Sequence, residues 1–186
     1  MKWKLLVSLL AVLSFFGAIA NAQDVSKVDV FAGYSYGREN PSTSGASSFS
    51  LNGGSASFAY NATHWLSGVA DFGAYHNGNI LGTGTDGTLS TYLFGPRVSY
   101  HHSGRITPFG EVLFGGAHAG ASIAGTSGSD NAFAMSLGGG VDYKLTDRFA
   151  IRPIKVDYLM TRFSETGTGN QTQNNLRVST GIVFRF

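Results

Sequence analysis

Charged side chains alternate with apolar ones in several short stretches of this chain, and they are its clearest candidates for chemistry. Asp142 and Lys144, for example, alternate with Val141 and Tyr143. A period of two places charged groups on one face of a β-strand and apolar groups on the other. The charged set comprises Asp29, Asp71, Arg97, Glu111, Asp142, Lys144, Lys155, Asp157, Arg177 and Arg185. Five acids and five bases on inner faces can form structural ion pairs, our main interpretation, or a path for protons or ions.

The composition limits the elements that can position these charges. The chain has 186 residues, enough for one domain, and only 13% are charged, below the roughly 25% usual in soluble domains. After the N-terminus, no apolar run approaches the roughly 20 residues that a membrane helix needs. Alternating strands satisfy both observations, because half of their residues can be apolar without any long apolar run.

Cysteine content and net charge exclude several kinds of site. The chain has no cysteine, which excludes disulfides, cysteine-ligated metals and thiol nucleophiles. The formal net charge of +2 includes Lys2 and Lys4. Without these two residues, 11 basic residues (13 minus 2) face 11 acidic ones, so we expect no basic surface for nucleic acid.

The N-terminal residues 1–22 have the three parts of a secretory signal peptide. Lys2 and Lys4 give a positive start, an apolar stretch follows, and residues 20–22 (Ala-Asn-Ala) match the A-x-A cleavage pattern. An uncleaved membrane anchor is the alternative. Because the apolar stretch is short, we expect cleavage, so that residues 23–186 form the exported domain.

Eight stretches alternate over at least the roughly 9–11 residues that a tilted membrane-spanning strand needs. In residues 176–186 the even positions are mostly apolar and end in Phe184 and Phe186, whereas the odd positions include Arg177 and Arg185. Tyrosines near the strand ends are typical of aromatic girdles at membrane surfaces. The predicted strands are residues 27–37, 51–62, 65–75, 88–101, 106–117, 131–145, 149–163 and 176–186.

The connections between these stretches alternate between long and short. Four long polar loops are expected at residues 38–50, 76–87, 118–130 and 164–175, and three tight turns lie between them. An outer-membrane barrel has this rhythm, because one rim faces outside and the other faces the periplasm. The even strand count puts both ends of the exported domain at the short-turn rim. We therefore predict an all-β, eight-stranded antiparallel up-and-down transmembrane barrel.

The interior of such a barrel is just wide enough for side chains to fill it. We expect charged and small side chains to plug the lumen, with an ion pair between Arg97 and Glu111 near its centre. A narrow porin for ions or small solutes is one alternative. A soluble periplasmic barrel of the lipocalin kind is another, but it would need an apolar lumen.

Several motifs resemble the small outer-membrane β-barrel proteins related to the OmpA transmembrane domain. They are residues 94–97 (Phe-Gly-Pro-Arg), 138–143 (Gly-Gly-Gly-Val-Asp-Tyr), 148–153 (Arg-Phe-Ala-Ile-Arg-Pro) and 156–158 (Val-Asp-Tyr). The resemblance covers nearly all of residues 23–186 and implies insertion into the outer membrane. Phe186, with Phe184, resembles the C-terminal aromatic signal that the barrel assembly machinery recognises. No peptidoglycan-binding domain follows the last strand, so we expect no cell-wall tether.

Other motifs favour loops and turns over catalytic or binding sites. Residues 82–87 fit Gly-x-Gly-x-x-Gly, but no amphipathic helix follows, so this stretch is interpreted as a loop. His101 and Ser103 have the spacing of the His-x-Ser pair of lipid A deacylases, but they fall on a predicted periplasmic turn. Asp86 and Asp130 are too isolated to predict a calcium site. We expect no catalytic residue, no cofactor and no metal.

The predicted function is that of a non-enzymatic integral outer-membrane protein with a structural or surface-interaction role. Its expected partners are outer-membrane lipids and, during biogenesis, the barrel assembly machinery and periplasmic chaperones. The sequence predicts no nucleic-acid partner and does not identify a surface partner.

Overall fold

The computed structural model describes residues 26–40, 48–80, 82–101, 104–123, 126–165 and 169–186. The expected signal peptide, residues 1–22, lies outside these ranges. In the described part, no helix is long and apolar enough to cross a membrane.

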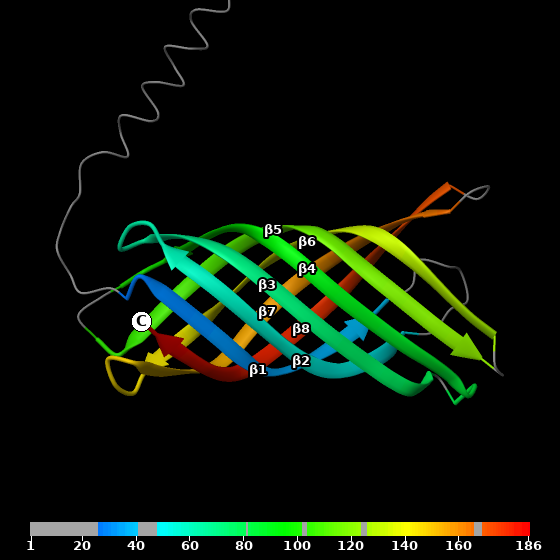
Figure 1. The fold of residues 1–186 in the computed structure, drawn as a ribbon, viewed down its shortest axis with the longest axis horizontal. Helices are drawn as coiled ribbons and strands as arrows, with labels where there is room; N and C mark the ends of the chain where they lie inside the picture. Colours follow the sequence, from blue (N-terminus) through cyan, green and yellow to red (C-terminus); the bar gives the residue numbers. More distant parts are fainter. Residues whose placement is uncertain (1–25, 41–47, 81, 102–103, 124–125, 166–168) are drawn as a thin grey trace, which may run out of the picture.

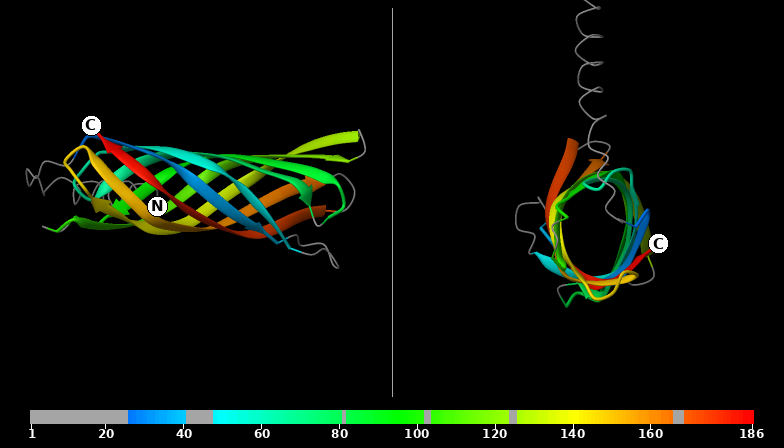
Figure 2. Two further views of the ribbon diagram at one scale, coloured as in Figure 1. Left: turned by 90° about the horizontal axis from the view of Figure 1, so that it is seen from below. Right: turned by 90° about the vertical axis from the view of Figure 1, so that its left-hand side faces the viewer.

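Eight antiparallel strands form one closed barrel, as predicted (Figure 1). They are β1 (Val28–Glu39), β2 (Phe49–Asn61), β3 (Leu66–Ile80), β4 (Thr85–Ser99), β5 (Ile106–Ile123), β6 (Thr126–Lys144), β7 (Phe149–Glu165) and β8 (Gly169–Arg185). Each strand pairs with the next along the chain, and β8 pairs with β1 to close the ring, which Figure 2 shows along its axis. Closure gives every strand a hydrogen-bonded neighbour on both sides, as a lipid environment requires.

The strands continue well into three of the four predicted loops. The loops expected at residues 76–87, 118–130 and 164–175 are mostly extensions of β3 to β8, so this prediction was wrong for most of their length. Gly and Asn are depleted in strands and Ser favours turns, but backbone pairing continues across these residue types, as in His118↔Asn131. The side chains of His118 and Asn131 also form a hydrogen bond, with 2.9 Å between Nδ1 and Oδ1.

The barrel has two different rims. We call the end with residues 62–65, 100–101, 104–105 and 145–148 the terminal rim, because Ser26 and Phe186 also lie there. The opposite end is the hairpin rim, where the strand pairs extend furthest (Figure 1). β5 to β8 have 17 to 19 residues and β1 to β4 have 12 to 15, so the wall is longer on the β5–β8 side.

The outer surface of the barrel is apolar and aromatic between the rims. Its exposed side chains include Tyr34, Phe58, Tyr60, Phe72, Tyr92, Phe94, Phe114, Phe133, Leu137, Ile154, Tyr158, Leu176 and Ile182. Outward-facing charge appears towards the hairpin rim, where Arg38 and Arg162 are exposed. A Lys or Arg facing lipid near the membrane midplane costs about 2–4 kcal/mol, so these two arginines mark the limit of the lipid-facing band.

Candidate functional site

The expected ion pair between Arg97 and Glu111 is present inside the barrel. β4 and β5 place these residues opposite each other, and Arg97 Nε donates to Glu111 Oε2 at 2.8 Å. Each residue is only 3% exposed. A carboxylate and a guanidinium group that are both removed from water in this way depend on each other for stabilisation.

Lys155 extends this pair across the lumen. Its Nζ atom lies 2.5 Å from Glu111 Oε1 and 3.0 Å from Asp71 Oδ2. Arg177 then bridges Asp71 and Asp157, at 2.8 Å to each. We call these six residues, Arg97, Glu111, Lys155, Asp71, Arg177 and Asp157, the central network. It joins five strands from β3 to β8 and contains three acids and three bases.

Arg152 is a buried cation that strict alternation places on the wrong face. The predicted set lacks Arg152, since strict alternation puts its even-numbered position on the same face as the outward Ile154. β7 has a register shift between Arg152 and Lys155, so that Pro153 and Ile154 both face outward and Arg152 faces the lumen. Proline lacks the amide that a sheet ladder needs, so Pro153 was the sequence signal for this irregularity.

Arg152 forms a second charged centre next to the central network. Its Nε and Nη2 atoms donate to Asp142 Oδ1 and Oδ2 at 2.7 and 3.0 Å, a bidentate pair. The Phe109 ring lies between Arg97 and Arg152, with each guanidinium carbon 4.4 Å from its centroid. Cation–π contacts of this kind are stronger when both groups are removed from water. Phe109 therefore links the two charged centres without adding charge.

Three residues of the predicted set lie at the terminal rim and outside the buried network. Asp29 accepts a hydrogen bond from Ser26 at 2.5 Å, and Arg185 is 3.9 Å from Asp142. Lys144 is half-exposed and pairs at 2.6 Å with Asp147, which lies in the β6–β7 turn. This hydrogen bond lowers the pKa of Asp147 below its usual value. Alternation gave the correct face for Lys144 but not its depth along the barrel axis.

Two glycines of the 138–140 run make space for the central network. A Cβ atom on Gly138 would overlap Asp157 Oδ1, and one on Gly140 would overlap the Phe109 ring and Lys155 Cα. Both glycines face the lumen, opposite Asp157 and Lys155 on β7. Glycine is therefore required at these two positions, because only a residue without a side chain leaves room for Asp157, Lys155 and Phe109.

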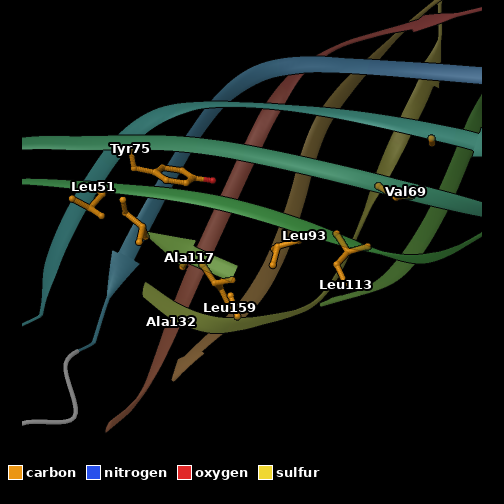
Figure 3. Packing of buried hydrophobic residues seen from close by; sticks show 11 residues of the cluster. Leu51, Val69, Tyr75, Leu93, Leu113, Ala117, Ala132 and Leu159 are labelled. Atoms are coloured by element: carbon orange, nitrogen blue, oxygen red, sulfur yellow. The ribbon is translucent and has the colours of Figure 1, made fainter. Parts of the chain in front are cut away.

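The lumen becomes apolar towards the hairpin rim, which the sequence reasoning did not anticipate. In β5, Glu111 is followed by inward Leu113 and Ala117, and in β7 Asp157 is followed by inward Leu159. Leu51 and Tyr75 belong to the same cluster, and Figure 3 shows these side chains directed into the barrel. The expectation of charged and small filling side chains holds for the middle of the lumen and is wrong for this end.

The predicted assembly residues lie at the seam between β8 and its neighbours. The Phe184 ring packs edge-on against Phe149, with centroids 5.2 Å apart. The Phe186 backbone oxygen accepts hydrogen bonds from the amides of Lys27 and Val28, while its side chain is 74% exposed. Among the described residues, no three His, Asp or Glu side chains are grouped so that they could hold a metal ion.

An apolar outer face and paired interior charges are the features of a barrel that resides in a lipid bilayer. The model of the family described as outer membrane protein beta-barrel domain matches residues 8–186. The chain belongs to this family. As an outer membrane beta-barrel protein, it is located in the outer membrane, with the band between its rims in contact with lipid.

Solved structures of other outer-membrane proteins have the same fold at low sequence identity. Neisserial surface protein A (NspA) superposes with a TM-score of 0.69 at 16% identity, covering 88% of this chain and 100% of NspA. Ail, the attachment invasion locus protein of Yersinia pestis, has a TM-score of 0.57 at 16% identity, with 86% and 99% covered. OprG from Pseudomonas aeruginosa has a TM-score of 0.50 at 11% identity, with 87% and 96% covered. No curated protein sequence matches the chain significantly.

Proposed function

We propose that this outer-membrane barrel is a non-enzymatic protein whose lumen is closed to solutes and whose hairpin rim makes contacts at the cell surface. The observation that carries the proposal is the central network, which joins five of the eight strands across the lumen. Each of its carboxylates contacts at least one cation, so moving a single side chain aside would leave buried charge without a partner. A solute would therefore have to break several ion pairs to pass.

The surface role rests on the hairpin rim and on the structural relatives. At this rim β5 to β8 extend furthest, and the extended parts carry polar residues beyond the lipid-facing band. Ail is named as an attachment invasion locus protein and NspA as a surface protein. Their names support a similar use of this rim.

Export and assembly complete the proposal. Residues 1–22 act as the cleaved signal, and residues 23–186 fold as the barrel. Phe184 and Phe186 are the assembly signal for the barrel assembly machinery, with periplasmic chaperones acting before insertion. The exposed side chain of Phe186 supports this assignment, because a receptor can bind it while the backbone pairs with β1.

Conductance across a planar lipid bilayer tests the closed lumen against the narrow-porin alternative. Purified, refolded protein should give no steady channel, because the central network fills the cross-section. As a matched variant, Lys155→Ala and Arg177→Ala together remove two of the network's three cations and should introduce measurable ion flow. Steady nanosiemens-scale channels from the wild-type protein would instead support the porin alternative.

A further inference from the structure

A cavity of about 560 Å³ lies inside the hairpin rim of the barrel. Its apolar lining includes Phe49, Leu51, Ile80, Leu89 and Ala119. No residue of the central network lines it, so the cavity is separate from the ion pairs. We call it the cup. Its volume lies in the range of roughly 300–1,000 Å³ that small-molecule sites occupy.

Among the described residues that line the cup, Glu39 carries the one buried carboxyl group. It ends β1, is 5% exposed and lines the cavity one residue beyond the outward Arg38. Among the residues that the structure describes, none donates a hydrogen bond to its carboxyl group or pairs with it. Burial raises the pKa of Glu39 to about 7. A buried carboxylate without a partner is costly, so this position favours a positively charged group beside it.

The other charged groups near the cup do not supply that positive charge. Asp130 of β6 also lines the cavity, and its Oδ1 accepts the amide hydrogen of Asn131. His76 of β3 pairs with Asp86 of β4 and both are exposed. Arg177 of β8 is held by Asp71 and Asp157 in the central network. The described lining therefore contains two acids and no Lys, Arg or His.

We propose that the cup binds a small amphipathic amine, with its apolar body against Leu51, Ile80 and Leu89 and its ammonium group beside Glu39. The apolar wall would contact the hydrocarbon body of the ligand, and the Glu39 carboxylate would attract its positively charged head group. A carboxylate of the same size would meet two acids and should be rejected. An alcohol of the same size would gain the apolar contacts without the ion pair.

Binding of three water-soluble probes to the barrel in lipid nanodiscs tests this assignment. Hexylamine, hexanol and hexanoate share one chain length and differ only in the head group. Amide chemical shifts at Ile80, Leu89 and Ala119 should report the site in titrations at pH 8. We expect hexylamine to bind at least tenfold more tightly than hexanol, and hexanoate not to bind.

Two variants and one pH series distinguish the contribution of the ion pair to hexylamine affinity from that of apolar contacts. Glu39→Gln should reduce hexylamine affinity to that of hexanol, while Asp147→Asn, at the opposite rim, should leave it unchanged. In the wild-type protein, lowering the pH from 8 to 6 should weaken hexylamine binding about tenfold, because Glu39 loses its charge near pH 7 while the amine stays protonated. This series needs no substitution, so it remains decisive if Glu39→Gln fails to fold.

Three results would overturn the proposal. One is equal binding of all three probes, and another is hexylamine affinity that does not change in Glu39→Gln or at pH 6. The third is shifts confined to lipid-facing residues such as Phe72 and Phe94, which would mean that the amine only partitions into the bilayer.

Discussion

Lys155 contacts three carboxylates inside the barrel, whereas Lys144 contacts one carboxylate in an exposed turn. Lys155 Nζ lies within 3.5 Å of Asp71, Glu111 and Asp157. Both lysines follow the same alternation in sequence. Breaking a buried pair leaves charge without a partner in a medium of low dielectric constant, while an exposed charge regains water.

The two lysines therefore predict opposite outcomes for the same substitution. Lys155→Met should lower the free energy of unfolding by about 3–5 kcal/mol, the usual cost of removing one partner of a buried pair. Lys144→Met is the matched control and should leave stability unchanged within error. Urea unfolding in lipid vesicles, followed by the fluorescence of Trp65, measures both. Equal stability of the two variants would contradict a stabilising role for the central network.

At the scale of elements, β8 closes the barrel against β1 and carries the C-terminal aromatic residues. Ten register pairs, from Asp29↔Arg185 to Arg38↔Leu176, join the two strands. These pairs close the eight-stranded barrel that the sequence predicts. The Phe186 backbone belongs to this seam, whereas its ring is exposed, so the seam and the proposed signal use different parts of one residue.

This separation allows a substitution that leaves the seam intact. Phe186→Ala keeps the backbone hydrogen bonds and removes only the exposed ring. We expect it to reduce the amount of barrel in the outer membrane of cells, while heat-modifiable gel mobility after refolding in detergent stays normal. The exposed Phe133→Ala, which pairs with Arg162 on the hairpin-rim side of β6, serves as the control. Unreduced assembly of Phe186→Ala would count against the assembly signal.

At the scale of the whole molecule, the two rims differ in the length of the strand pairs that extend beyond the lipid-facing band. The terminal rim has only short connections and holds both Ser26 and Phe186. The hairpin rim has the extended β5 to β8 and the cup. Outer-membrane barrels place short turns in the periplasm, so the hairpin rim should face outside.

The absence of cysteine from the chain makes this orientation simple to test. Thr83→Cys lies in the exposed β3–β4 turn at the hairpin rim, and Asp147→Cys lies in the β6–β7 turn at the terminal rim. A membrane-impermeant maleimide should label position 83 in intact cells and position 147 only after the outer membrane is permeabilised. The intact mass of the same proteins should correspond to residues 23–186. The reverse labelling pattern would show that the terminal rim, and not the hairpin rim, faces outside.

Much of the architecture followed from the sequence because strand alternation is a local property. Two neighbouring side chains on a strand must point to opposite faces, so Asp71, Glu111 and Asp157 were correctly placed inside before any partner was known. The number of strands and their order followed in the same way. Loop composition was a weaker signal, because His118 and Asn131 pair across strands in a stretch that was predicted to be a loop.

Only the tertiary structure decided which side chains from different strands are in contact and how deep each charged group lies along the barrel axis. The β7 irregularity turned Arg152 inward, the position of Lys144 at the rim exposed it to water, and the barrel axis brought Leu113 and Leu159 together above the charges. Glu39 became a candidate binding residue for the same reason. It lines a cavity whose wall is completed by residues of β2 to β8, which no local pattern in β1 describes. Alternation determines the face of a side chain, whereas closure of the ring determines its neighbours.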